Sequence, residues 1–405
     1  MQLRTGTPEE VGMCSARINR LRCRAATWAD GKRHSALVVL AARRGVIVLQ
    51  EAFGQLTPDP ASSPVQLDSI FPIASISKPI AATAVMILVE DALLGLNRRV
   101  QEYIPEFIGP GKEQVTVHHL LTHTSGLGDS AIDLHIVAKT GTLDLAGLVD
   151  NPDAVHDLYR ALGYDAPLIC PPGQRHIYCQ YGYELVGQII ERVSGQALPD
   201  FVHERIFAPL GMNDSHYGIP HELRPRMVRR PDDAAFAQPN TIAVVGAPIL
   251  CRALGGFNTS AFMENVWTCG NIYSTAPDLL RFGQMFLNQG TYAGTRILSP
   301  AAIALIRRNP ILGVGAWSGN QQISAEASYG YGWHINGNIR YLNEGSLMSP
   351  ETIQHSGAGG VAIWLDPTVE LVSIYFSVEL QNGLFNEHKW SADLFINGIT
   401  AAVIE

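Results

Sequence analysis

The stretch Ser75-Ile76-Ser77-Lys78, which opens the apolar run of residues 79–89, decides how this chain is interpreted. A spacing of three puts Ser75 and Lys78 on one face of a helix, one turn apart. A serine hydroxyl needs a neighbouring base to act as a nucleophile, and a lysine becomes that base when burial and neighbours lower its pKa. Because proline is tolerated only near the start of a helix, Pro79 places Ser75 at the helix N-terminus.

Taken alone, this pattern is more often a capping serine beside a lysine whose stem lies on apolar surface. Its setting favours chemistry, because the chain of 405 residues has only five lysines and this one precedes an apolar run. Whether the four-residue pattern marks a catalytic site therefore depends on the other motifs in the chain.

Composition sets the broad class of the protein. With 405 residues, 46% hydrophobic and 16% charged, the chain is long enough for two domains, or for one large domain with an inserted lobe. A net charge of −8 without a basic cluster argues against nucleic acid as a partner. No uncharged apolar stretch reaches membrane-spanning length, so we expect no membrane partner.

The N-terminal segment and the cysteines suggest a compartment. The first residues lack the apolar core of a signal peptide, so we expect a cytoplasmic protein. The six cysteines are scattered and none forms a Cys-x-x-Cys pair. In a reducing compartment they are expected to be free thiols rather than a zinc site or a disulfide framework.

Secondary-structure patterns predict an α+β fold. Residues 36–40 and 46–50 form one predicted β-hairpin, and residues 361–365 and 371–378 form another around Asp366-Pro367. Helices are predicted after Lys78 and over three further ranges: 183–193, 276–287 and about 387–403.

Strands at both ends with helices between them predict one antiparallel sheet built from both chain ends and flanked by helices, with a mainly helical domain inserted. We expect residues 1–73 and 295–405 to form the sheet domain and residues 74–294 the helical one, with the active site between them. Loops over residues 218–261, together with residues 329–338, are expected to shape a substrate pocket.

A second informative stretch brings tyrosines to the start of a helix. A Pro171-Pro172-Gly173 turn leads into a segment that holds Tyr178 and Gln180. The phenol of Tyr178 could exchange a proton with Ser75, although without further context a tyrosine-rich loop that packs the helix start is the favoured interpretation.

A third stretch, Gln354-His355-Ser356-Gly357-Ala358-Gly359-Gly360, precedes a predicted strand. Small residues at a strand edge let a ligand approach the backbone, and a free N–H there can serve an oxyanion hole. A phosphate loop would need a following Lys-Ser/Thr and a helix, which are missing. A glycine-rich hairpin connection is the other interpretation.

Together the three stretches resemble the serine β-lactamase-like superfamily, which includes class C β-lactamases, penicillin-binding DD-peptidases and family VIII carboxylesterases. Residues 115–127, 206–212 and 270–279 resemble linking segments of that family, and the likeness runs in order from about residue 8 to about residue 380.

The resemblance implies roles for particular residues. Ser75 would be the acyl-accepting nucleophile, Lys78 its partner, and Tyr178 the general base and then acid. The backbone N–H groups of Ser75 and Ala358 would form the oxyanion hole. The substrate-binding positions would be Gln180, His355, Ser356 and Gly357. No metal or organic cofactor is implied, and whether Lys78 or Tyr178 takes the proton is left open.

Two departures from the β-lactamase pattern favour an esterase. Gln180 stands where many members have Asn, and His355 stands where β-lactamases and DD-peptidases have Lys. The family lysine helps bind a carboxylate, and imidazole is mostly uncharged near neutral pH. The resemblance therefore implies a serine hydrolase for small or short-acyl esters, with β-lactamase, D-amino-acid peptidase and acyl-transfer activity as alternatives. The oligomeric state is not predicted.

Other function classes fit the sequence less well. The chain has no Gly-x-Ser-x-Gly pentapeptide of an α/β-hydrolase. His118, His119 and His123 suggest a metal site, but no glutamate follows His119 to act as a base. A non-catalytic binding protein of the same family would usually have lost the serine, the lysine or the tyrosine.

Overall fold

The structure, a computed structural model, describes residues 2–29, 34–142, 144–148, 154–230, 258–337, 345–379 and 386–405. The helices are α1 Ser15–Ala26, α2 Ser77–Glu90, α3 Val100–Tyr103, α4 Val117–Leu121, α5 Asp129–Thr140, α6 Ala154–Gly163, α7 Gln180–Ser194, α8 Leu198–Val202, α9 Ala208–Leu210, α13 Ser260–Glu264, α14 Ala276–Leu287, α15 Pro300–Ile306 and α16 Asn386–Thr400. The strands are β1 Arg4–Thr5, β2 His34–Arg43, β3 Val46–Gly54, β4 Phe71–Pro72, β5 Arg175–Ile177, β6 His216–Tyr217, β7 Ile272–Ser274, β8 Thr291–Tyr292, β9 Thr295–Arg296, β10 Gly315–Ser318, β11 Gln321–Ser324, β12 His334–Ile335, β13 Ile353–Gly357, β14 Val361–Asp366 and β15 Leu371–Glu379.

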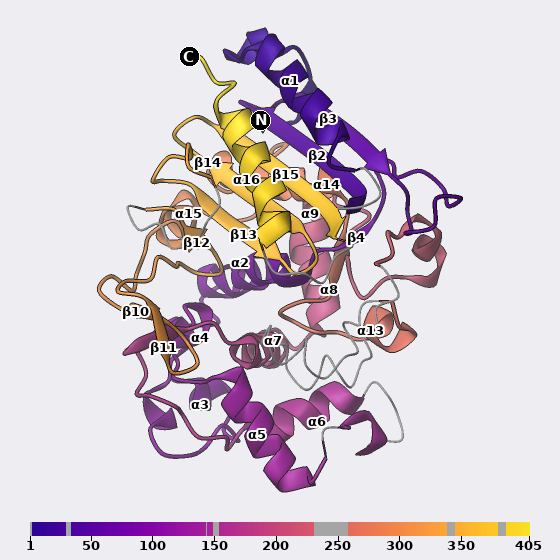
Figure 1. The fold of residues 1–405 in the computed structure, drawn as a ribbon. Coiled ribbons are helices and arrows are strands. Elements are labelled where there is room, and N and C mark those ends of the chain that lie inside the picture. The colour runs from indigo at the N-terminus through magenta and orange to yellow at the C-terminus, as the bar shows by residue number, and fades with distance from the viewer. Residues whose placement is uncertain are drawn as a thin grey trace.

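The main sheet joins the two ends of the chain (Figure 1). Its order is β1-β3-β2-β15-β14-β13-β12, and all neighbours except β1 and β3 are antiparallel. The pairing of β2 with β15, in which Leu40 lies opposite Ile374, closes the sheet between segments far apart in sequence. Both predicted hairpins and the predicted α+β class are confirmed.

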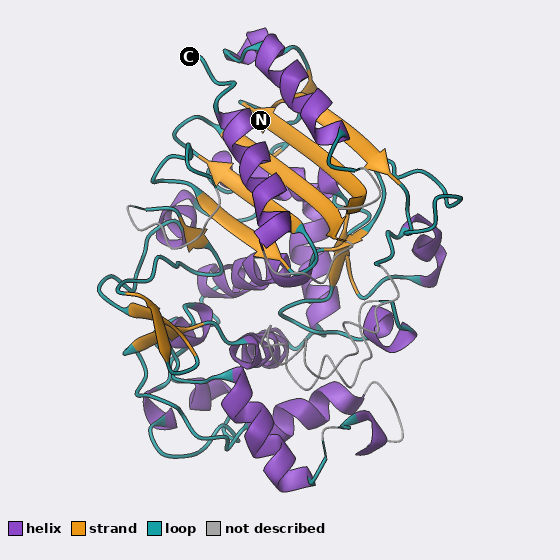
Figure 2. Ribbon diagram, viewed as in Figure 1, coloured by secondary structure: helices purple, strands orange, loops and turns teal. Residues whose placement is uncertain are grey.

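The two faces of the sheet pack against different helices (Figure 2). Along β2, Val38 and Leu40 belong to the large core shared with α2, α7 and α14, whereas Leu37 and Val39 belong to the core under α1 and α16. The alternation follows from the two-residue period of a strand, and a strand buried on both faces needs a continuous apolar run. The sheet is therefore covered by helices on both sides.

The predicted helix after Lys78 is confirmed as α2, which lies in the interior. Its residues from Ser77 to Leu88 are all buried, as expected for a helix that is apolar on every side. Helix α7 packs against it. Two small three-stranded sheets, β4-β7-β6 and β5-β10-β11, lie outside the main sheet.

The other predicted helices are confirmed as α7, α14 and α16, and α14 has the predicted bounds. The division into domains at residues 73 and 295 stays a prediction. Within the described ranges, no helix is both long and apolar enough to cross a membrane, and the predicted cytoplasmic location stays a prediction.

Trp364 offers a test of how the sheet is held against α16. Its side chain is buried, and its ring centre lies 6.2 Å from that of Phe395 in α16. Trp364→Ala leaves a cavity on the sheet face opposite α2, so we expect the free energy of unfolding to fall by about 3–5 kcal/mol in urea titrations. Leu347→Ala, at a residue that is 55% exposed, should change it little. Equal effects of the two substitutions would contradict this packing.

Candidate active site

Ser75 lies in a strained turn directly before α2. The 3₁₀ turn Ala74–Ile76 connects to α2, and Ala74 has a φ of 46°, in the left-handed region that costs energy for a residue with a Cβ. The hydroxyl of Ser77 donates to the carbonyl of Ala74 at 2.7 Å and accepts from the N–H of Ile272 at 3.2 Å. The turn is thus fixed against β7, and the half-buried Ser75 is presented at the end of α2.

Lys78 is the central polar group of the site. It is fully buried, and its Nζ donates to Ser75 Oγ at 3.0 Å and to the carbonyl oxygen of Cys269 at 3.0 Å. The predicted contact between serine and lysine is therefore present. Two backbone segments, the turn before α2 and the loop before β7, meet at this ammonium.

The pKa of Lys78 is raised, which corrects the expectation that burial and neighbours lower it. Burial lowers this pKa, but the charges of Tyr178, Cys269 and Asp129 and a hydrogen bond with Tyr178 together outweigh burial. Lys78 is accordingly an ammonium at neutral pH, and it donates a proton to Ser75 Oγ in a hydrogen bond rather than accepting one. Such a cation favours negative charge on oxygen atoms around it.

Tyr178 lies beside this ammonium. It follows β5 and precedes Cys179, the residue before α7, and its ring centre is 4.7 Å from Lys78 Nζ. The ring also packs on His123, with 4.4 Å between the ring centres. The structure thus brings together Ser75, Lys78 and Tyr178, the three residues that the sequence predicts to be catalytic; their roles stay predictions.

The carboxylate of Asp129 fixes the start of α7. It accepts from the backbone N–H of Gln180 at 2.9 Å and of Tyr181 at 3.0 Å, and from the thiol of Cys179 at 3.2 Å. An acidic group at a helix N-terminus satisfies N–H groups that have no partner within the helix. Asp129 therefore anchors the segment that carries Tyr178, a role that sequence reasoning did not find.

Gln180 contacts the residue that holds Lys78. Its Oε1 accepts from the thiol of Cys269 at 3.2 Å. Cys269 was also missed by the sequence analysis, where it is one of the scattered thiols. Its contact with Lys78 is made by a backbone carbonyl, which leaves no signature in residue type.

The end of β13 reaches the turn that carries Ser75. A Cβ on Gly357 would lie 2.3 Å from the carbonyl oxygen of Ile73, so only glycine lets the strand approach this closely. Ala358 follows Gly357, and the N–H of Ser75 belongs to the first turn of a helical segment, where N–H groups lack helical partners. This arrangement is compatible with the predicted oxyanion hole.

His355 is buried in β13 and uncharged at neutral pH. Its Nδ1 lies 2.8 Å from the carbonyl oxygen of Ser356, which makes Nδ1 the donor, and its Nε2 lies 3.5 Å from the hydroxyl of Tyr329. Burial, and to a lesser extent the charge of Lys78, lowers the pKa of His355 to about 3. The expectation of a weakly basic histidine at this position agrees with that value, and Ser356 beside it is half-buried.

The histidines that suggested a metal site have protein partners. Nδ1 of His118 lies 2.9 Å from the hydroxyl of Tyr331, Nδ1 of His119 accepts from the N–H of Thr116, and Nδ1 of His123 accepts from the N–H of Cys179. The described ranges contain no group of three or more histidine, cysteine or acidic residues placed to hold a metal ion.

The predicted pocket-shaping segments are described only in part. Of residues 218–261, residues 231–257 lie outside the described ranges, and residue 338 of the second segment does as well. The described remainder includes α13 and the buried Trp333, whose ring stacks on Phe282 at 6.3 Å in the core.

Comparison with known proteins identifies the family. A family model described as Beta-lactamase matches residues 24–396. Esterase EstB of Burkholderia gladioli is 29% identical over 369 residues, which cover 82% of this chain and 90% of that protein. Penicillin-binding protein 4 of Amycolatopsis lactamdurans is 34% identical over 279 residues, which cover 67% of this chain and 64% of that protein.

Solved structures agree on the fold. A family VIII carboxylesterase has a TM-score of 0.74 at 23% identity, with 96% of this chain and 99% of that chain covered. A penicillin-binding protein homologue from Caulobacter crescentus has a TM-score of 0.75 at 23% identity, with 96% and 99% covered. With a family model that spans most of its length, the chain belongs to the Beta-lactamase family of serine hydrolases.

Proposed function

We propose that this protein is a serine carboxylesterase that hydrolyses small or short-acyl esters through an acyl-enzyme on Ser75. The observation that carries the proposal is the buried Lys78 ammonium, 3.0 Å from Ser75 Oγ and beside the ring of Tyr178. The uncharged His355 favours an ester over a substrate with a carboxylate. Similarity to Esterase EstB supports the same choice.

In the proposed reaction, Ser75 Oγ attacks the ester carbonyl carbon as its proton passes to the oxygen of Tyr178, which reacts in its phenolate form beside the Lys78 cation. The N–H groups of Ser75 and Ala358 hold the tetrahedral oxyanion. As the C–O bond to the alcohol breaks, Tyr178 returns the proton to the leaving oxygen. Water then attacks the acyl-enzyme by the same route and releases the acid and Ser75.

The position of His355 argues for uncharged substrates. A lysine at this place in β13 would offer a cation to a substrate carboxylate, whereas the buried imidazole is neutral and donates through Nδ1 to its own strand. Gln180, Ser356 and Gly357 remain proposed substrate contacts. β-Lactam hydrolysis, cleavage of D-amino-acid peptides and acyl transfer to an alcohol or amine would use the same nucleophile, so substrate comparison separates them.

The nucleophile is tested by substitution. Ser75→Ala removes the attacking oxygen, and we expect hydrolysis of p-nitrophenyl butyrate to fall by roughly 10⁴-fold or more. Lys78→Ala and Tyr178→Phe should each lose roughly 10²-fold to 10⁴-fold in kcat, because proton transfer to and from Ser75 fails. Ser130→Ala, at an exposed serine in α5, is the control and should keep full activity. Near-wild-type turnover by Ser75→Ala would refute the proposed mechanism.

Substrate preference is tested at position 355. Nitrocefin has a carboxylate, so we expect kcat/KM for p-nitrophenyl butyrate to exceed kcat/KM for nitrocefin by roughly 100-fold. His355→Lys supplies a cation for that carboxylate and should reduce the ratio of the two kcat/KM values about tenfold. His355→Gln stays neutral and should leave the ratio unchanged.

The pH dependence of the same ratio tests the charge of His355. A lowered pKa means that this imidazole is charged only below about pH 3, so the ratio should be flat between about pH 5 and about pH 8. Wild-type turnover of nitrocefin that rivals turnover of the ester would contradict the esterase assignment.

A further inference from the structure

A buried carboxylate lies behind the residue that holds Lys78. Glu184, one turn along α7 from Gln180, is fully buried, and its Oε1 accepts from the backbone N–H of Cys269 at 3.2 Å. Its Oε2 is hydrogen-bonded to Nε2 of His156 and lies 3.9 Å from Nε of Arg160. Burial raises the pKa of Glu184, but the interactions with His156, the charge of Arg160 and a hydrogen bond with the side chain of Cys269 together outweigh burial and lower it. Glu184 is therefore an anion at neutral pH.

Cys269 is held from two sides. On one side, Oε1 of Gln180 accepts from the thiol of Cys269, and Oε1 of Glu184 accepts from its backbone N–H. Both acceptors can reach the same residue because side chains four positions apart lie on one face of a helix. On the other side, its carbonyl oxygen accepts from Lys78 Nζ at 3.0 Å. Helix α7 thus fixes the position of the Cys269 carbonyl, which accepts the hydrogen bond from the Lys78 ammonium.

The next turn of α7 presses against the same loop. A Cβ on Gly187 would lie 2.0 Å from Oγ1 and 3.0 Å from Cγ2 of the buried Thr268, so glycine is required for the helix and the loop to come this close. The carbonyl of Thr268 also accepts from the hydroxyl of Tyr217 at 3.2 Å. The loop at residues 268–269 has little freedom to move away from α7.

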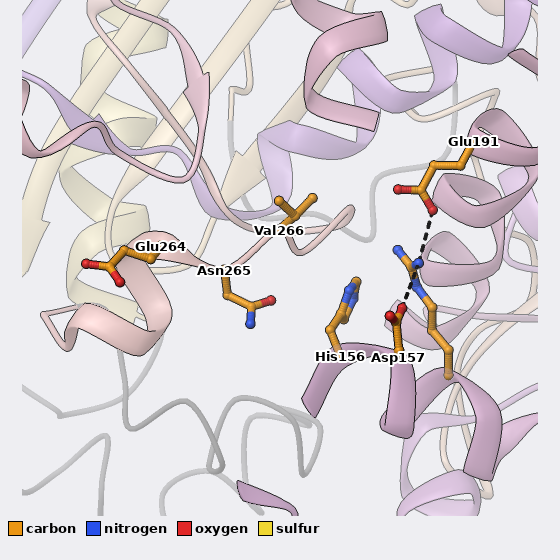
Figure 3. Close-up of a pocket in the computed structure, with 7 residues that line it drawn as sticks. His156, Asp157, Glu191, Glu264, Asn265 and Val266 are labelled. Carbon is orange, nitrogen blue, oxygen red and sulfur yellow. Dashed lines mark hydrogen bonds and ion pairs between the residues drawn. The ribbon is translucent and has the colours of Figure 1, made fainter. Parts of the chain in front are cut away.

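The far side of this cluster opens into a pocket of about 480 Å³, whose lining residues include His156, Arg160 and Glu191 (Figure 3). There Nη1 of Arg160 donates to Oε2 of Glu191 at 3.1 Å, on the same helix as Glu184. Glu191 is 30% exposed and shares the partner Arg160 with Glu184, but its carboxylate accepts from Arg160 and from the N–H of Leu198 rather than from Cys269. It is therefore a matched control for the buried carboxylate.

We propose that Glu184 is a positioning residue that aims Lys78 at Ser75 by fixing Cys269, an inference that rests on the proposed acyl-enzyme function. An ammonium has three N–H donors. Lys78 directs one to Ser75 Oγ and one to the Cys269 carbonyl, and the ring of Tyr178 lies beside the ammonium. A small displacement of the carbonyl redirects the ammonium, and misplacements of about 1 Å cost roughly 100-fold in rate.

The main test compares Glu184→Gln with Glu191→Gln. Glu184→Gln replaces a charged acceptor by a neutral one, so we expect kcat for p-nitrophenyl butyrate to fall about tenfold. We expect KM to change less than about twofold, because Glu184 is not one of the proposed substrate contacts. The rate of Ser75 labelling by a fluorophosphonate should fall in parallel. Glu191→Gln should leave all three quantities near wild type. A kcat for Glu184→Gln within about twofold of wild type, or an equal fall in Glu191→Gln, would overturn the proposal.

A second variant displaces the loop without touching the buried charges. Gly187→Ala forces Thr268 away from α7 and should produce the same fall in kcat at constant KM. Thr268→Ala added to Gly187→Ala removes Oγ1 and Cγ2 and should restore part of kcat. Full activity in Gly187→Ala would show that the loop position does not matter and would overturn the proposal even if Glu184→Gln does not fold.

Failure of the inference is distinguishable from failure of the proposed function. Each variant is compared with wild type and Ser75→Ala at equal folded fraction, judged by circular dichroism and the unfolding midpoint. Wild-type turnover that depends on Ser75 but is unaffected by Glu184→Gln overturns the positioning role alone. Absence of turnover that depends on Ser75 in wild type overturns both proposals.

Discussion

The buried ammonium of Lys78 is the interaction on which the rest of the site depends. Transfer of an ammonium from water to a protein interior costs several kcal/mol unless polar partners replace the water. Among the described residues, no carboxylate forms an ion pair with Lys78; the hydroxyl of Ser75, the carbonyl of Cys269 and the ring of Tyr178 surround it instead. Each of these groups must be held in place, and each is held by a different part of the chain.

The fold supplies those supports from distant segments. Ser75 is fixed by the turn before α2, Cys269 by α7, and Tyr178 by the Asp129 carboxylate at the start of α7. The sheet, built from both chain ends, brings Gly357 and Ala358 against the turn through the close approach at Ile73. Glycine at position 357 is thus a requirement of packing next to the proposed oxyanion hole.

Much of this arrangement could be predicted from sequence where local patterns determine structure. The spacing of Ser75 and Lys78 predicted their contact, and apolar, β-branched runs separated by turns predicted both hairpins. The direction of the pKa of Lys78 was predicted wrongly, because it depends on charges from Tyr178 and Asp129 that only the folded chain brings near. The carbonyl of Cys269 could not be predicted, since every residue has one and only position distinguishes it.

The most direct test of the central claim is to trap the covalent intermediate. Protein mixed with excess p-nitrophenyl butyrate, quenched in acid during steady-state turnover and digested, would be analysed by peptide mass spectrometry. An acyl-enzyme mechanism predicts one butyryl group on the peptide that contains Ser75, absent in Ser75→Ala. Turnover with no acylated peptide under any quench time, or a butyryl group on another residue that persists in Ser75→Ala, would contradict it.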